Sequence, residues 1–163
     1  KTFYVELKPD PEKPWGRREE RVHNLTRAHL EEHGVERLDG IRRFAEWVRR
    51  TAEAMAPESS PLLIGFNTPF DWMWLVMAFA EADVRNPFGM SAVDLKSVYY
   101  TLHGGDDLTW KKTVKRFVRQ VYPTSLVADH HALADALEQA ELARTLRAVA
   151  RGNRIPPRLP SDR

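Results

Sequence analysis

The sequence contains no cysteine, no apolar run long enough to span a bilayer, and no large excess of either charge. Without cysteine the chain forms neither disulfides nor thiolate metal sites, and this suits a reducing compartment, so we expect a cytoplasmic protein. The lack of a spanning run predicts no membrane partner. The net charge is +2, from 25 Lys and Arg against 23 Asp and Glu. This small excess does not by itself indicate nucleic-acid binding.

The composition is that of a globular protein. The chain has 163 residues, of which 42% are apolar, and five Trp and seven Phe supply large side chains for a core. We therefore expect one domain over residues 1–150. The last segment, 151–163, contains three prolines and several arginines, and we expect a flexible basic tail there.

The hydrophobic pattern predicts an α/β fold in which helices cover a sheet. The alternating segment 1–9 and the apolar run 61–66 predict two strands. Segment 91–103 fits a strand or a helix, and a helix is favoured after Asp94. Further predicted helices cover 26–35, 39–55, 70–82, 108–122 and 129–151. The helix over 70–82 is almost wholly apolar, so we expect it to be buried. Two strands are few for such a fold.

Two of these helices have distinct faces. In 108–122 an apolar stripe includes Trp110, Val114 and Val121, and the basic residues between them either track phosphates or are merely solvated. In 129–151 the spacing predicts that Leu133, Leu137, Ala140 and Leu146 point inward.

A few polar side chains stand out against this apolar background. Asp71 begins an almost wholly apolar helix, where a carboxylate is costly unless it is paired, bound to a metal ion or stabilised by the helix dipole. Asp135 follows His131 by four residues, so the two share a helix face, and a simple local contact would explain that pair equally well. Zinc binding by His130 and His131 is a weaker alternative, because adjacent helical residues point in different directions.

Two segments together resemble the second and third motifs of the DEDDh 3′–5′ exonuclease family. They are "GFNTPFD" at 65–71 and "HHALADA" at 130–136, in the family's order, and the resemblance extends over about residues 2–146. "DLKSVYY", opened by Asp94, also resembles the family segment between them. The matched positions are Asn67, Phe70 and Asp71 in the second motif and His130, Ala132, Asp135 and Ala136 in the third.

This resemblance implies a fold, a reaction and a site. The fold would be ribonuclease H-like, with a central mixed sheet flanked by helices. The reaction would be hydrolysis of phosphodiester bonds at the 3′ end of single-stranded DNA or RNA, with two Mg²⁺ or Mn²⁺ ions. Asp71 and Asp135 would bind the metal ions, and His130 would be the general base. Phe66, Asn67 and Phe70 would contact the substrate by stacking and hydrogen bonding, although both phenylalanines, and Phe70 more so, would also suit the core.

The sequence departs from the family at the first motif, Asp-x-Glu on the first strand. Its one literal copy, Asp10 to Glu12, lies among prolines, and Glu6 has Tyr4 where the aspartate should be. Segment 3–9 resembles the third family strand better. We therefore expect that the first strands are missing from the chain, which begins with Lys1 rather than methionine.

Two hypotheses follow. In the first, the protein is a metal-dependent exonuclease whose first motif is supplied upstream of Lys1. In the second, it keeps the fold as a catalytically impaired module that binds nucleic acid or a partner. The sequence does not indicate whether the substrate is DNA or RNA. A homodimer is one possible assembly.

Overall fold

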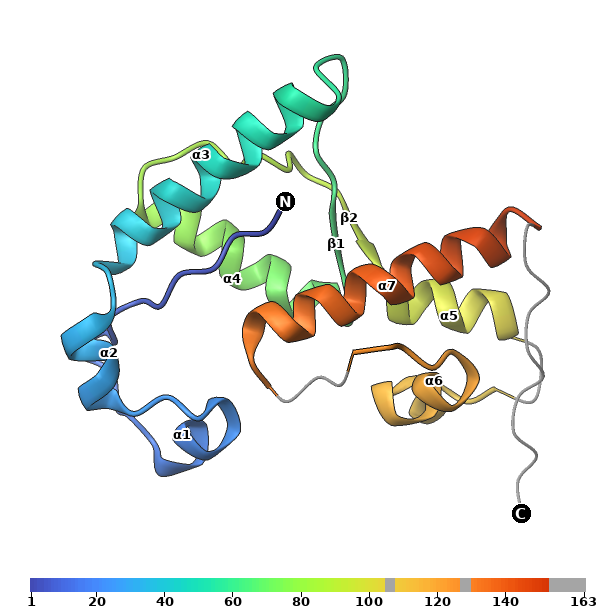
Figure 1. Cartoon of the computed structure of the whole chain (residues 1–163), viewed down its shortest axis with the longest axis horizontal. Helices are drawn as coiled ribbons and strands as arrows, with labels where there is room; N and C mark the ends of the chain where they lie inside the picture. The colour runs from blue at the N-terminus through green and yellow to red at the C-terminus, as the bar shows by residue number, and fades with distance from the viewer. Residues whose placement is uncertain (105–107, 127–129, 153–163) are drawn as a thin grey trace.

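The computed structural model describes residues 1–104, 108–126 and 130–152, except for the side chains of residues 17–19. Helices dominate, with two short strands between them (Figure 1). The predicted tail, 153–163, lies outside the described residues. The elements are α1 (Arg17–His23), α2 (Arg27–His33), α3 (Arg37–Met55), β1 (Leu63–Gly65), α4 (Thr68–Glu81), β2 (Ala92–Asp94), α5 (Leu95–His103), the 3₁₀ helix η1 (Trp110–Thr113), α6 (Lys115–Val121) and α7 (Ala132–Ala150).

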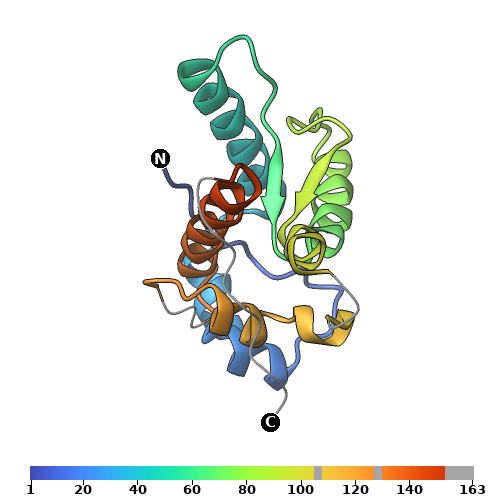
Figure 2. The same ribbon diagram turned by 90° about the vertical axis from the view of Figure 1, so that its right-hand side faces the viewer.

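The two strands form a parallel pair joined by α4. Leu63, Ile64 and Gly65 pair with Ala92, Val93 and Asp94, and α4 provides the crossover that parallel strands require. In Figure 2, α7 lies beside β1 and α4 beside β2. The α/β class predicted from the sequence is therefore confirmed. Within the described residues, however, the sheet is two-stranded and parallel rather than mixed.

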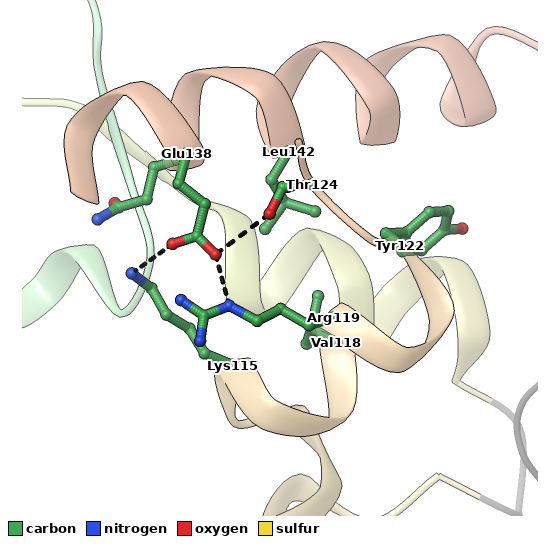
Figure 3. Close-up of a pocket in the computed structure, with 8 residues that line it drawn as sticks. Lys115, Val118, Arg119, Tyr122, Thr124, Glu138 and Leu142 are labelled. Atoms are coloured by element: carbon green, nitrogen blue, oxygen red, sulfur yellow. Dashed lines mark hydrogen bonds and ion pairs between the residues drawn. The ribbon is translucent and has the colours of Figure 1, made fainter. Parts of the chain in front are cut away.

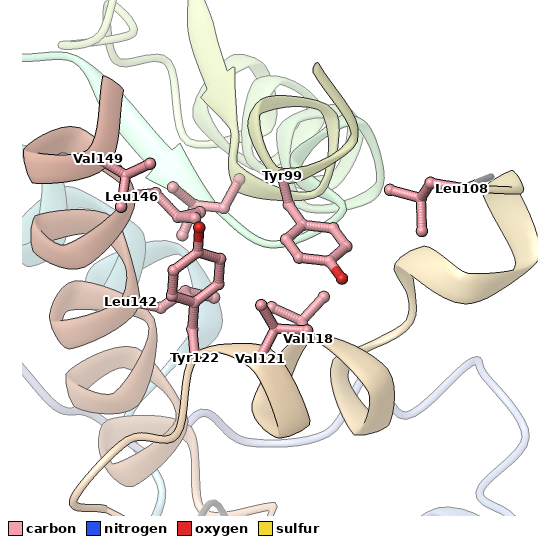
Figure 4. Packing of buried hydrophobic residues seen from close by; sticks show 9 residues of the cluster. Tyr99, Leu108, Val118, Val121, Tyr122, Leu142, Leu146 and Val149 are labelled. Atoms are coloured by element: carbon pink, nitrogen blue, oxygen red, sulfur yellow. The ribbon is translucent and has the colours of Figure 1, made fainter. Parts of the chain in front are cut away.

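The main hydrophobic core lies between α5, α6 and α7. Figure 4 shows Tyr99 from α5 and Val118 from α6 packed toward Leu146 from α7. Tyr122, just after α6, is almost fully buried in the same cluster. This core packs the second half of α7, through Leu142, Leu146 and Val149, against α5 and α6, and the first turn of the same helix carries Asp135.

A second packing centre is aromatic and joins the N-terminal segment to α3 and α4. The Phe44 ring of α3 lies 5.5 Å from Phe3 and 6.2 Å from Phe79 of α4. Trp47 and Phe88 complete the cluster. These ring contacts hold the apolar side of α3, which includes the buried Ala45 and Val48, against the N-terminal segment and α4.

The strand predicted over 1–9 does not form. Its backbone pairs with another segment only around Leu7, through an isolated bridge to Val35. Glu6 and Lys8 each exchange one backbone hydrogen bond with Val35. The alternating pattern made the segment extended, but a strand also needs a neighbouring strand, and none lies beside it among the described residues.

Helix α4 is far more exposed than its sequence predicts. Only Thr68 and Phe79 are buried, whereas Phe70, Met73, Trp74 and Met77 are each half exposed or more. These four residues recur at helical spacing, so they form one continuous apolar face. Within the described parts of the chain, no helix combines the length and the apolarity that a membrane crossing requires.

The C-terminal helices also differ from prediction. The expected helix over 108–122 breaks at Val114 into η1 and α6, and Trp110 and Val114 stay exposed. In α7 the buried positions are Glu138, Leu142, Leu146 and Val149, whereas Leu137 and Ala140 are exposed. The inward face is thus rotated by about one residue, and it includes an acid that the apolar pattern alone had placed outside.

Candidate functional site

Asp71 lies in the first turn of α4, directly after β1. Asn67 adopts a left-handed conformation with φ 64°, and this turns the chain from strand to helix. The Asp71 side chain retains solvent contact, yet nearby atoms desolvate its carboxyl, and this burial raises its pKa. A backbone hydrogen bond and the charge of Lys115 partly oppose the shift. A cation beside Asp71 would therefore favour its ionised form.

Asp94 holds this turn in place. Its Oδ1 accepts hydrogen bonds from the backbone N–H of Asn67 at 2.7 Å and of Thr68 at 3.2 Å. Its Oδ2 accepts from the Ser97 hydroxyl at 2.6 Å, and the side chain caps α5. Burial alone would raise the pKa of Asp94, but these hydrogen bonds outweigh it and the net pKa is lowered. The sequence singled out Asp94 only as a boundary, although Asp three residues before Ser is a capping pattern.

The segment before α7 presents the two histidines. His130 is exposed and has a positive φ of 66°, a strained conformation for a residue other than glycine. His131 occupies the N-cap position of α7 and stacks on Tyr4, with ring centroids 4.8 Å apart. The Tyr4 hydroxyl in turn donates to Glu6, which also accepts from His29. His131 is thus a packing partner for the N-terminal segment.

Asp135 lies in the first turn of α7 and is partly buried. Its backbone N–H donates to the His131 carbonyl. The Oδ1 atom is buried and has no hydrogen-bond partner among the described residues. Buried polar atoms are almost always satisfied, and a bound cation or water would satisfy this one.

Glu138, one turn further along α7, is a buried acid that the sequence did not reveal. Its side chain is only 4% exposed and binds Lys115 at 3.2 Å and Arg119 at 2.5 Å, both from α6 (Figure 3). Burial opposes ionisation, but the bonds from Arg119 and Lys115 outweigh it and lower the pKa of Glu138. One indication was available: Glu138 falls on the same stripe as Leu142, Leu146 and Val149.

The three predicted substrate contacts lie in different surroundings. Phe66 packs against the main core, and its backbone N–H donates to Gln139 Oε1 at 2.8 Å. Phe70 is 58% exposed and meets Trp74 edge-on. The expectation that Phe70 suits the core better than Phe66 is therefore wrong. Asn67 is exposed, so Asn67 and Phe70 remain accessible to a ligand.

Both predicted metal ligands interact electrostatically with basic side chains of α6. Lys115 acts electrostatically on Asp71, and Arg119, whose pKa is raised mainly by its hydrogen bond to Glu138, also feels the charge of Asp135. His130 forms no hydrogen bond or ion pair with Asp71 or Asp135 within the described residues. Asp10 and Glu6, the acids nearest to a first motif, are engaged by Lys13 and by His29.

The described residues fit a divalent cation only in part. Asp71 and Asp135 offer hard oxygen donors, and the partnerless Asp135 Oδ1 suits a cation. Yet no group of three or more His, Asp or Glu residues able to hold a metal ion exists within the described parts of the chain. Two carboxylates make an incomplete donor set, so further ligands would be needed.

Comparison with known proteins gives one informative match. No family model matches the chain. A curated protein of Escherichia coli, the 3′–5′ DNA exonuclease Cap18, is 31% identical over 123 residues. This alignment covers 76% of the chain but 62% of the relative, so the chain spans less than two thirds of that protein's length. Over most of its length, the chain is therefore similar to a 3′–5′ DNA exonuclease.

Proposed function

We propose that the protein is a metal-dependent 3′–5′ exonuclease that removes nucleotides from the 3′ end of single-stranded DNA. The similarity to a 3′–5′ DNA exonuclease carries this proposal, and its name favours DNA over RNA. The partnerless Asp135 Oδ1 and the desolvated Asp71 carboxyl support it, because both favour a nearby cation.

Each residue has a role in this scheme. Asp71 and Asp135 bind the Mg²⁺ or Mn²⁺ ions, which when bound stabilise the charge that develops on the phosphate. His130 accepts the proton of the attacking water, and its exposure leaves room for that water. Asp94 holds the turn that carries Asn67 and Phe70, which contact the terminal nucleotide, and Phe66 supports them from the core side.

A complete site of this kind needs two more acids. We propose that they lie on a further strand along the free edge of β1, in a ribonuclease H-like sheet. Among the described residues β1 pairs only with β2. The half-exposed Ile64 and Leu62 and the apolar face of α4 would be covered by such a strand.

The test is hydrolysis of single-stranded DNA labelled at its 5′ end, with Mg²⁺ or Mn²⁺, followed on a sequencing gel. We expect a ladder of products shortened from the 3′ end and none with EDTA. His130→Ala and Asp135→Asn should each reduce the rate by about 100-fold or more, because general bases contribute about 10²–10⁴-fold. Asp39→Asn, an exposed carboxylate paired with Arg42 on α3, is the matched control and should stay active. Unchanged rates in the first two variants would refute the proposal.

The second candidate is a non-catalytic module that binds nucleic acid or a partner. The incomplete donor set favours it. It predicts that the protein binds single-stranded DNA without shortening it under any metal condition, and that Asp135→Asn leaves this binding unchanged.

A further inference from the structure

Two cations of α6 converge on one buried carboxylate of α7. Lys115 Nζ lies 3.2 Å from Glu138 Oε2, and Arg119 Nε lies 2.5 Å from Oε1. Figure 3 shows both side chains directed from α6 toward Glu138. Two positive charges and one negative charge leave the cluster with a net charge of +1. Such a cluster repels a metal cation and attracts an anion.

The cluster also keeps hydrogen-bond donors free for a ligand. A lysine ammonium carries three N–H donors and an arginine guanidinium carries five. The hydrogen bonds to Glu138 use the Lys115 ammonium and the Arg119 Nε. The side chains of Lys115 and Arg119 are 29% and 39% exposed, whereas that of Glu138 is 4% exposed. The buried acid thus fixes the two cations, while their remaining donors reach the surface.

The position of the cluster relates it to the candidate site. Burial raises the pKa of Asp71 and the charge of Lys115 partly opposes this, while the pKa of Arg119 is raised mainly by Glu138 and further by the charge of Asp135, so both cations lie within electrostatic range of the candidate site. Asp135 also precedes Glu138 by less than one turn of α7. A nucleic-acid phosphate that approaches Asp71 and Asp135 is repelled by their charges, so a cationic neighbour at this position would offset the repulsion.

We propose that Lys115 and Arg119 bind a backbone phosphate of single-stranded DNA beside Asp71 and Asp135, and that Glu138 is the positioning residue that holds them. This inference rests on the proposed function for the nature of the substrate and names the residues that bind its backbone. Because Glu138 fixes both side chains before the ligand arrives, less conformational entropy is lost on binding.

The test measures binding rather than hydrolysis. A 5′-fluorescein thymidine oligomer is titrated with the protein in EDTA at several salt concentrations, and fluorescence anisotropy gives Kd. Each phosphate contact on a single strand contributes about 0.7 to the slope of log K against log salt. Lys115→Met should therefore make the slope shallower by about 0.7, and Lys115→Arg should restore it. Lys111→Met, an exposed lysine of η1, should leave it unchanged.

A double variant distinguishes a local contact of Lys115 with phosphate from an effect of the net charge of the cluster. Lys115→Met combined with Glu138→Gln leaves the cluster at +1, as in the wild type, and avoids an unpaired buried carboxylate if Lys115→Met alone folds poorly. We expect the slope to stay shallower by about 0.7 in this variant. A wild-type slope in the double variant, or an equal change in Lys111→Met, would overturn the inference and leave a purely structural ion cluster. If the wild-type protein does not hydrolyse single-stranded DNA but its salt dependence of binding still changes in Lys115→Met, only the proposed exonuclease activity would be refuted.

Discussion

His103 places a titratable group against the main core. Its Nε2 lies 2.7 Å from the Tyr122 hydroxyl, and its ring contacts Tyr99 and Tyr122. Both tyrosines are 1% exposed. Burial lowers the pKa of His103, because the charged imidazolium loses solvation there. The folded state therefore favours the neutral ring.

This shift predicts a pH dependence of stability. As the pH falls below the usual histidine pKa of about 6.5, the unfolded chain takes up a proton at His103 before the folded chain does. The free energy of unfolding should therefore decrease from about pH 7.5 to about pH 5.5. His103→Gln, which can still bond to Tyr122, should weaken that decrease. Urea denaturation of both proteins at the two pH values measures the difference, and identical pH profiles would contradict the assignment.

At the scale of secondary structure, one side chain connects three elements. Asp94 ends β2, caps α5 and accepts the backbone N–H groups that start α4. The Thr68 hydroxyl donates back to the Val93 carbonyl at 3.0 Å. The turn that carries Asn67 is therefore fixed by β2 and not by its own helix, since Asn67 makes no side-chain cap.

Removal of this connection should destabilise the protein measurably. Asp94→Ala should lower the free energy of unfolding by about 2 kcal/mol, the upper end of the range for an N-cap, because N–H groups of two helices lose an acceptor. Ser97→Ala removes one donor to Asp94 and should cost about 1 kcal/mol or less. Thermal and urea denaturation give both values. Equal losses in the two variants would mean that Asp94 acts only through Ser97.

At the scale of the whole molecule, the apolar surface is unevenly covered. The C-terminal half buries its large side chains between α5, α6 and α7. The α4 face, formed by Phe70, Met73, Trp74 and Met77, stays exposed. A continuous exposed apolar surface of this kind usually serves as a contact surface.

The open face predicts binding of apolar probes. The protein should enhance the fluorescence of anilinonaphthalene sulfonate in its native state, and Trp74→Lys with Met77→Lys should reduce that enhancement. The melting temperature should change little, because these side chains are already about half exposed. Met55→Lys, at the end of α3 and outside this face, is the control and should keep the wild-type fluorescence. Wild-type probe fluorescence in the double variant would show that the probe binds elsewhere and would contradict this prediction.

The local sequence pattern was enough to predict most of the helices. The Thr26 hydroxyl oxygen accepts the backbone N–H of His29 and so caps α2, and Gly34 ends that helix. The predicted helix over 39–55 appears as α3, and the boundary at Asp94 separates β2 from α5. Capping and helical spacing depend on neighbours in the sequence, so they can be recognised without the fold.

Long-range pairing was not predictable in the same way. The extended 1–9 segment lacks a neighbouring strand, and α4 lacks a covering layer over Phe70 and Trp74. Apolar composition predicts burial only if another element is available to cover it. Such coverage is a property of the assembled molecule.

The sequence by itself determined that Asp71 and Asp135 lie near the starts of two helices, because motif spacing and helical periodicity are local properties. It placed His130 inside the predicted helix over 129–151, whereas α7 begins at Ala132 and leaves His130 before it. Only the tertiary structure decided what surrounds them. It rotated α7 so that Glu138 faces inward, and it directed Lys115 and Arg119 toward that acid, where the sequence had left phosphate binding and solvation as equal alternatives. The reason is that a buried carboxylate is stable only with partners, and these partners come from a helix distant in sequence.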